Sequence, residues 1–195
     1  MTSKQKLLQL AVEGIGGRHW YRTANKCIGE FCHTHYVDTD KFICGLAVLS
    51  PQISVSQNMH LAVGWFMCQV PPNLMRSVNI SFENLIKGDY RRECIKGPKT
   101  GRFADALMGD PGAVVLDTHM GYALGVPATR LRNKSIQQES EKRIKWVANQ
   151  LSWTPAETQA AIWTGQRAQA GHRPSGIERW QLDRALNNNK DNNPF

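Results

Sequence analysis

The sequence lacks the long apolar runs and the paired cysteines that mark membrane and disulfide-bonded secreted proteins. No stretch approaches the roughly 20 uninterrupted apolar residues that a membrane-spanning helix needs. The five cysteines are odd in number and scattered, and Cys44 and Cys68 lie among large apolar residues, as buried reduced cysteines do. Residues 1–9 are polar, and no signal-peptide hydrophobic region follows them. We therefore expect a cytoplasmic protein that does not contact the membrane.

Acidic residues are in the minority, with 16 Asp and Glu against 24 Lys and Arg, which gives a net charge of +8. A basic chain favours a polyanionic partner, although many basic proteins never bind nucleic acid. Part of the excess lies in one stretch, and it is either a solvated helix face or a surface that grips a duplex. Its members are Arg130, Arg132, Lys134, Lys142, Arg143 and Lys145.

Internal repeats and coiled-coil heptads are absent, and the apolar spacing is that of separate helices. Phe42, Leu46 and Leu49 form one stripe at helical spacing, with Asp40 as the expected N-cap. A helix is also predicted over 98–108 between Pro98 and a glycine-rich turn. A short apolar run could form a strand, but no second segment is suited to pair with it, so we predict an all-α fold.

The C-terminal third carries two patterns that are typical of helix starts. Thr154 and Glu157 form a capping box that opens a helix to residue 170. A similar pattern at Ser175 opens a last helix through about residue 186. The asparagine-rich residues 187–195 are then expected to be a frayed polar tail.

A first motif lies in residues 42–54, where an apolar helix ends in Leu-Ser-Pro-Gln. It resembles the helix-hairpin-helix DNA glycosylases, the superfamily that includes endonuclease III and the 8-oxoguanine glycosylases. In these enzymes a glutamine at the position of Gln52 enters the duplex and fills the space left by the flipped base. Such a wedge offsets part of the unstacking cost, which is a few kcal/mol. The alternative is a solvent-exposed glutamine at a helix end.

A second motif, residues 94–101, resembles the hairpin and second helix of the same superfamily. The resemblance assigns backbone contacts with a DNA phosphate to four residues at the turn and helix start, namely Gly97, Pro98, Thr100 and Gly101. It also leaves a monovalent cation at the hairpin as an option. Ile95 stands where the first motif glycine is expected. Because a β-branched residue does not easily adopt positive φ, we expect a distorted hairpin.

A third motif, residues 114–120, resembles the superfamily's Val-Asp-x-His turn. Apolar residues lead to Asp117, which is also predicted to cap the next helix, and His119 is expected to support this turn beside the DNA. The interval from Lys99 to Asp117 is 18 positions, which matches the endonuclease III branch. This spacing is the most specific feature of the sequence.

The resemblance implies that Lys99 and Asp117 are the catalytic residues. A carboxylate stabilises the positive charge that develops on the sugar as an N-glycosidic bond breaks, and a deprotonated lysine amine can attack C1′. Branches that only hydrolyse the base lack this lysine. The resemblance therefore predicts a monomeric DNA glycosylase with abasic-site lyase activity on double-stranded DNA, in a bacterial or phage-infected cell.

The resemblance also implies a two-lobed fold with a cleft between the lobes. Residues 30–135 are expected to hold the hairpin and the catalytic pair, and residues 1–29 with 136–186 to form the second lobe. No cysteine follows Cys94, so the iron–sulfur cluster of many relatives is not expected, and no other cofactor is predicted.

Two other functions remain open from the sequence. Phage relatives on this fold are implicated in base hypermodification, in which a substituent on thymine loses pyrophosphate and the strand stays intact. A non-catalytic DNA-binding module is the third option, and Ile95 favours it.

Two smaller clusters are open to more than one interpretation. Residues 27–35 hold two cysteines and two histidines, but no second ligand pair follows, so no metal site is predicted. Residues 19–22, His-Trp-Tyr-Arg, are interpreted as an aromatic core contact rather than a base-stacking surface.

Overall fold

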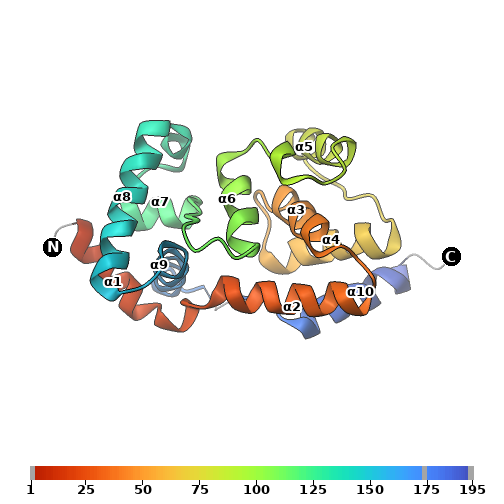
Figure 1. Ribbon diagram of the computed structural model, residues 1–195, viewed down its shortest axis with the longest axis horizontal. Helices are drawn as coiled ribbons and strands as arrows, with labels where there is room; N and C mark the ends of the chain where they lie inside the picture. The colour runs from red at the N-terminus through yellow and green to blue at the C-terminus, as the bar shows by residue number, and fades with distance from the viewer. Residues whose placement is uncertain (1–2, 173–174, 193–195) are drawn as a thin grey trace. The chain divides into compact units, whose positions relative to one another are not determined.

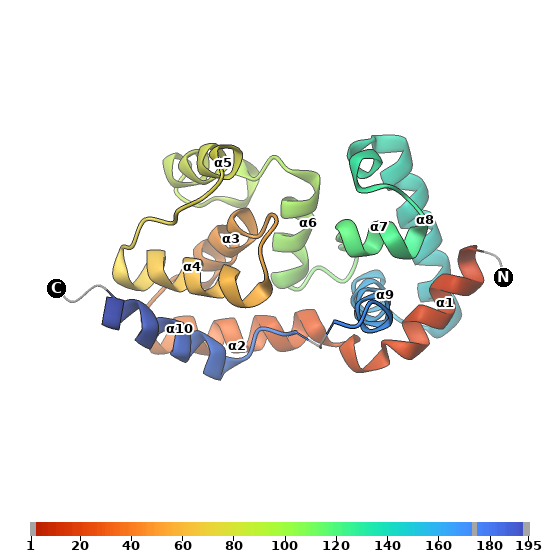
Figure 2. The same cartoon turned by 180° about the vertical axis from the view of Figure 1, so that it is seen from behind.

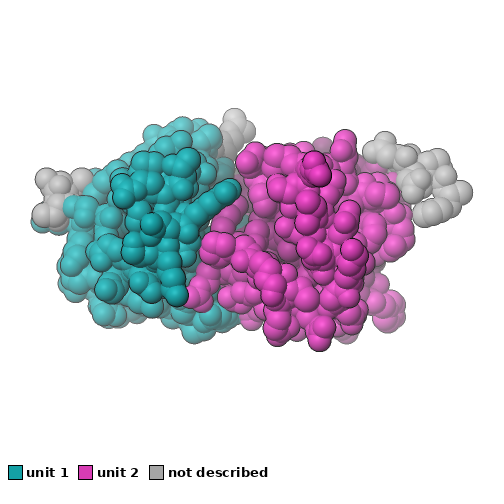
Figure 3. Space-filling model, turned by 90° about the horizontal axis from the view of Figure 1, so that it is seen from above, with its two compact units in different colours: residues 1–22, 109–174 teal, residues 23–108, 175–195 magenta. Residues whose placement is uncertain are grey.

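The computed structural model describes residues 3–172 and 175–192, and over these ranges it is all-helical, without a strand. This confirms the predicted all-α class. None of the described helices combines the length and apolar character needed to cross a membrane. The chain forms two compact units (Figure 3): unit 1 comprises residues 1–22 and 109–174, and unit 2 comprises residues 23–108 and 175–195.

Unit 1 is built around the last long helix of its sequence, α9. Helices α1, α7 and α8 all contact α9, and their apolar faces form one buried core with Leu7, Met120, Ile144 and Ile162 among its members. Figure 1 shows these helices, whose bounds are α1 (Ser3–Glu13), α7 (Thr118–Leu124), α8 (Lys134–Leu151) and α9 (Pro155–Gln169), with 3-10 turns η1 (Ile15–Gly17) and η3 (Ala128–Arg132).

A close helix contact fixes α1 against α9. A Cβ atom added at Gly165 would lie 2.2 Å from the carbonyl oxygen of Leu10, and one added at Gly14 would lie 2.0 Å from that of Ala161. Only glycine allows two backbones to approach this closely. The position of α9 in unit 1 therefore depends on these two glycines.

Unit 2 is organised around helix α3, in which every residue from Phe42 to Leu49 is buried. Helices α4, α5 and α6 contact α3, and α10 packs along α4, as Figure 2 shows from behind. The bounds are α2 (Trp20–Thr34, which begins in unit 1), α3 (Thr39–Leu49), α4 (Val55–Cys68), α5 (Arg76–Lys87), η2 (Arg92–Cys94), α6 (Pro98–Leu107) and α10 (Arg179–Asn192).

Two predicted helix starts are wrong. Asp38, rather than Asp40, caps α3, because its carboxylate accepts a hydrogen bond from the Lys41 N–H at 2.9 Å. The last helix begins at Arg179 and not at Ser175. Short range sequence signals locate a helix here but leave its first residue ambiguous by a few positions.

The predicted frayed tail is also wrong as far as Asn192, because α10 continues to that residue. Asn189 is buried, and its side-chain amide donates hydrogen bonds to the carbonyl oxygens of Ala185 at 2.8 Å and His60 at 3.1 Å. A polar residue can lie in a helix interface when its hydrogen bonds are satisfied. Residues 193–195 of the expected tail lie outside the described residues.

The boundaries of the two units differ from the division expected from the sequence. The expected hairpin domain of residues 30–135 contained both Lys99 and Asp117, whereas Lys99 belongs to unit 2 and Asp117 to unit 1. Contacts between helices distant in sequence, such as α1 with α9, set these boundaries, and local sequence patterns do not contain that information.

Candidate functional site

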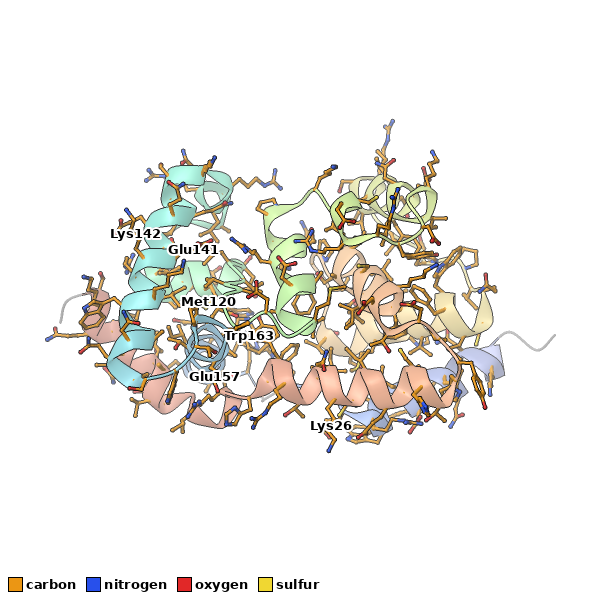
Figure 4. The ribbon with its side chains drawn as sticks, in the orientation of Figure 1. Lys26, Met120, Glu141, Lys142, Glu157 and Trp163 are labelled. Atoms are coloured by element: carbon orange, nitrogen blue, oxygen red, sulfur yellow. The ribbon has the colours of Figure 1, made fainter. Side chains whose placement is uncertain are left out.

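Asp117 lies at the start of α7, after the buried residues 113–115. One of its carboxylate oxygens, Oδ1, accepts a hydrogen bond from the Met120 N–H at 2.9 Å, which confirms the predicted N-cap. The other, Oδ2, accepts one from the Trp163 indole N–H at 2.8 Å. Figure 4 labels Met120 on α7 and Trp163 on α9. The carboxylate is thus held in one orientation by donors from two helices.

Aromatic and basic side chains surround the Trp163 ring. Its centroid lies 6.1 Å from that of His119 and 6.2 Å from that of Trp20. The Arg167 guanidinium lies over the ring, 4.6 Å from its centroid, and the His172 ring lies 5.4 Å from that of His119. Together with Asp117, these residues form what we call the Asp117 cluster.

His119 is half-buried in this cluster, and burial lowers the pKa of its imidazole. Asp117 attracts a proton to the ring and opposes this shift, whereas the positive charge of Arg167 and a charged His172 add to it. The Nδ1 atom of His119 is buried and has no hydrogen-bond partner within the part of the chain that the structure describes. The lowered pKa favours a neutral ring, consistent with a structural role beside Asp117.

Tyr21 and Gln159 complete the buried side of the Asp117 cluster. The Tyr21 hydroxyl donates a hydrogen bond to Gln159 Oε1 at 2.6 Å. Burial, with a further contribution from the Asp117 charge, raises the pKa of Tyr21, so the phenol stays protonated. Trp20 packs against Tyr21 with ring centroids 5.1 Å apart. Trp20 and Tyr21 thus make the intramolecular aromatic contacts expected for residues 19–22.

Four residues of this cluster were not predicted from the sequence, namely Gln159, Trp163, Arg167 and His172. A signal for three of them was present: Gln159, Trp163 and Arg167 recur every four residues, and the Thr154 capping box fixes the helix on which they share a face. The partner of that face, however, is α7, which no local pattern identifies.

Lys99 occupies the first turn of α6 in unit 2, after Gly97 as N-cap and Pro98 at the first helical position. The Lys99 side chain is half-buried. The Thr100 hydroxyl donates to the Gly97 carbonyl oxygen at 3.1 Å, and a Cβ on Gly97 would lie 2.4 Å from that hydroxyl oxygen. The glycine is therefore explained by this side-chain contact, since its φ of −71° is open to any residue.

The segment before α6 differs from a tight hairpin. Helix α5 ends at Lys87, and residues 88–97 with the turn η2 lead to α6. Ile95 is buried with a φ of −81°, so the isoleucine needs no positive φ and makes an apolar contact instead. Arg92 holds the segment through a two-pronged ion pair with Asp105, at 2.7 and 2.9 Å. A Cβ on Gly101 would lie 2.7 Å from the Arg92 guanidinium, which explains this glycine.

Gln52 lies in the turn between α3 and α4 with its side chain exposed. Its φ is +62°, a left-handed conformation that is uncommon for residues other than glycine. The turn thus presents Gln52 to solvent. Both interpretations of this residue, a wedge that enters the duplex and a solvent-exposed glutamine, fit this position.

The basic stretch is divided between structural and exposed positions. Arg143 is half-buried and donates to the Leu124 carbonyl oxygen at 3.1 Å, whereas Lys145 is exposed and pairs with Glu141 at 3.9 Å. The remaining four, Arg130, Arg132, Lys134 and Lys142, are exposed. Figure 4 shows Lys142 on α8. In the region around Cys27 and His35, and elsewhere in the described residues, no group of three or more potential ligands could hold a metal ion.

A model of a family of unknown function, DUF7178, matches residues 11–170. The chain belongs to this family. The matched range includes Lys99, Asp117 and Trp163, whereas α10 lies beyond it. No curated protein and no solved structure matches the chain.

Proposed function

We propose that this protein is a DNA glycosylase with abasic-site lyase activity, of the helix-hairpin-helix type. The observation that carries the proposal is the Asp117 carboxylate, held by the Met120 N–H and the Trp163 indole within the Asp117 cluster. A carboxylate in a fixed orientation can stabilise the cationic sugar without reorganising during the reaction. The match of the motifs and of the 18-position spacing gives Lys99 its role.

In the proposed reaction the neutral Lys99 amine attacks C1′ of the damaged or modified nucleotide. The C1′–N bond breaks, its electron pair leaves with the base, and the base takes up a proton. The sugar ring opens to a Schiff base on Lys99. Loss of a 2′ proton then expels the 3′ phosphate and nicks the strand. Gln52 fills the gap in the duplex while the target nucleotide is flipped.

Borohydride trapping on duplex DNA with one abasic site tests the Lys99 role without knowledge of the target base. Reduction of the Schiff base leaves a stable protein–DNA bond that is seen as a band of higher mass. We expect the wild type to form this band and Lys99→Gln to lose it. Lys96→Gln is the matched control, because it removes an exposed positive charge from the same segment. Equal trapping by Lys99→Gln and the wild type would overturn the lysine assignment.

Asp117→Asn separates base release from lyase chemistry. Asparagine keeps an oxygen for the Met120 N–H, but it removes the charge that stabilises the departing sugar. We expect base release from a panel of modified duplexes to slow by about 10²–10³-fold, a typical loss for one electrostatic group. Trapping on a preformed abasic site should change less, because no glycosidic bond has to break.

Trp163→Phe separates the charge from its orientation, because it removes the indole donor and retains the carboxylate, so base release should slow less than in Asp117→Asn. If Asp117→Asn releases bases as fast as the wild type, Asp117 is a structural cap only. Mass spectrometry of the digested DNA gives an independent readout. An altered base in an intact strand would overturn the glycosylase assignment in favour of base modification.

A further inference from the structure

A cavity of about 410 Å³ lies in unit 2, away from both proposed catalytic residues in sequence. It is bounded by the first turns of α4 and by α10. The lining includes Ser56, Gln57, His60, Trp180, Gln181 and Arg184. The packing of α10 along α4 does not by itself require an open cavity lined by these side chains.

Trp180 and Arg184 are one helical turn apart on α10, and both are exposed. The Trp180 side chain is 56% exposed, although large aromatic residues usually bury most of their surface. Its indole N–H donates a hydrogen bond to the Glu178 carboxylate, which fixes the plane of the ring. In the described chain no carboxylate pairs with Arg184, and none lines the cavity.

The two helices that bound the cavity are held together by specific contacts. The Asn189 amide nitrogen lies 3.2 Å from His60 Nδ1 and donates to the His60 carbonyl oxygen. A Cβ on Gly64 would lie 2.7 Å from Asn189 Oδ1, so the glycine permits this close approach. The two walls of the cavity are therefore held against each other by contacts within unit 2.

The lining indicates the chemistry of that ligand. A fixed, exposed indole provides a stacking surface for a planar heterocycle, and a guanidinium one turn away can bind a phosphate. Amide and hydroxyl groups on the opposite wall can form hydrogen bonds with the edge of a base or with a sugar. The charge of Arg184, without a carboxylate among the lining residues, favours an anion over a cation.

We propose that this cavity binds an unpaired nucleotide of a DNA strand, with its base stacked on Trp180 and its phosphate on Arg184. The choice of a DNA strand rests on the proposed function, whereas the choice of a nucleotide rests on the cavity itself. The cavity would hold DNA outside the nucleotide that reacts, and it would favour substrates with a single-stranded flank.

Fluorescence anisotropy with a labelled oligothymidylate of ten nucleotides tests the proposal. We expect Trp180→Ala to weaken binding by roughly 5- to 150-fold, the range for the loss of one base–aromatic stack. Trp180→Phe keeps a stacking face and should retain most of the affinity. Arg184→Gln should weaken binding and reduce the slope of log K against log salt by about 0.7, the value for one phosphate on a single strand.

Matched controls come from exposed positions of unit 2 outside the cavity. Tyr36→Ala removes an aromatic side chain that is 99% exposed, and Arg76→Gln removes an exposed positive charge. Both should bind as the wild type does. Equal affinity of Trp180→Ala and the wild type, or equal losses in Trp180→Ala and Tyr36→Ala, would overturn the proposal. Circular dichroism confirms that each variant is folded.

Two further measurements distinguish the possible failures. Thymidine monophosphate that binds as tightly as the oligonucleotide, with the same dependence on Trp180, would show a free-nucleotide site and overturn the strand assignment. Trp180→Ala should still be trapped on abasic duplex at saturating DNA. If no protein is trapped while oligonucleotide binding depends on Trp180, the cavity assignment stands and the proposed reaction fails.

Discussion

Units 1 and 2 both place glycines at helix contacts, but the group that meets the glycine differs. In unit 1 the contact at Gly165 is with the backbone of Leu10. In unit 2 a Cβ on Gly45 would meet the Phe66 ring, with its nearest atom at 2.5 Å. A ring on a flexible side chain can shift to accept an added methyl group, whereas the backbone of a packed helix cannot shift alone. Unit 1 is therefore the less tolerant of change.

This difference bears on the Asp117 cluster. Gly165 and Trp163 are two residues apart on α9, and the Trp163 indole holds the Asp117 carboxylate. The close contact of α1 with α9 thus sets the position from which Trp163 reaches α7. A rigid helix contact suits a group that has to be oriented accurately, since a small displacement would lengthen a hydrogen bond of 2.8 Å.

The largest expected effect on stability is that of Gly165→Ala. The added methyl group meets the Leu10 carbonyl oxygen, so the helices have to separate, and we expect a loss of about 3 kcal/mol, at the upper end for overpacking. Gly45→Ala should cost about 1 kcal/mol, because the Phe66 ring can move. Urea unfolding of both variants measures the difference.

Gly16→Ala is the control in unit 1, because nothing lies within 4 Å of the added Cβ, and it should not destabilise the protein. Equal losses in Gly165→Ala and Gly45→Ala would show that the two units tolerate crowding alike. A glycine that meets backbone would then be no more sensitive to an added methyl group than one that meets a side chain.

Local patterns in the sequence were sufficient for much of the fold. The capping box at Thr154, the N-cap at Asp117 and the helix that begins at Pro98 all appear where they were predicted. Each depends on residues within one helical turn, so a short sequence pattern is enough to locate it. The full length of α10 could not be predicted from a local pattern. Asn189 in this helix hydrogen-bonds to His60, which is distant in sequence.

The candidate site shows the same difference between local patterns and contacts that are distant in sequence. Asp117 was singled out because residues 114–120 resemble a superfamily motif, and its N-cap, which the structure confirms, was predicted from the same short segment. Its bond to Trp163 was missed because it joins residues on different helices, 117 and 163. Ile95 was expected to distort a hairpin, but its burial and negative φ follow from a longer connection that the motif comparison did not anticipate.

An intermediate effect is expected when the capping carboxylate is removed. Asp117→Ala loses the N-cap and the acceptor for Trp163, and each contributes about 1 kcal/mol, so we expect a loss of about 2 kcal/mol. Asp117→Asn keeps the cap oxygen and should lose about half as much. The start of α6 has no side-chain cap to lose, so Gly97→Ala should cost only about 0.5 kcal/mol, because the Thr100 hydroxyl can turn away from the added Cβ. Thermal unfolding checks the order, and a Gly97→Ala loss as large as that of Asp117→Ala would contradict it.

The smallest expected effect concerns pH and the half-buried His119 ring of unit 1. Burial lowers the pKa of His119 from its ordinary value of 6.5, so the unfolded chain binds a proton at a higher pH than the folded chain does. The contribution of His119 to stability is therefore full above pH 6.5, decreases as the pH falls below that value, and levels off once the folded protein is also protonated.

His119→Phe keeps a ring beside Trp163 and removes the titration, so its stability should change less between pH 7.5 and pH 5 than that of the wild type. Urea unfolding across this range measures both proteins, and parallel curves for His119→Phe and the wild type would show that the half-buried ring does not contribute to the acid sensitivity of unit 1.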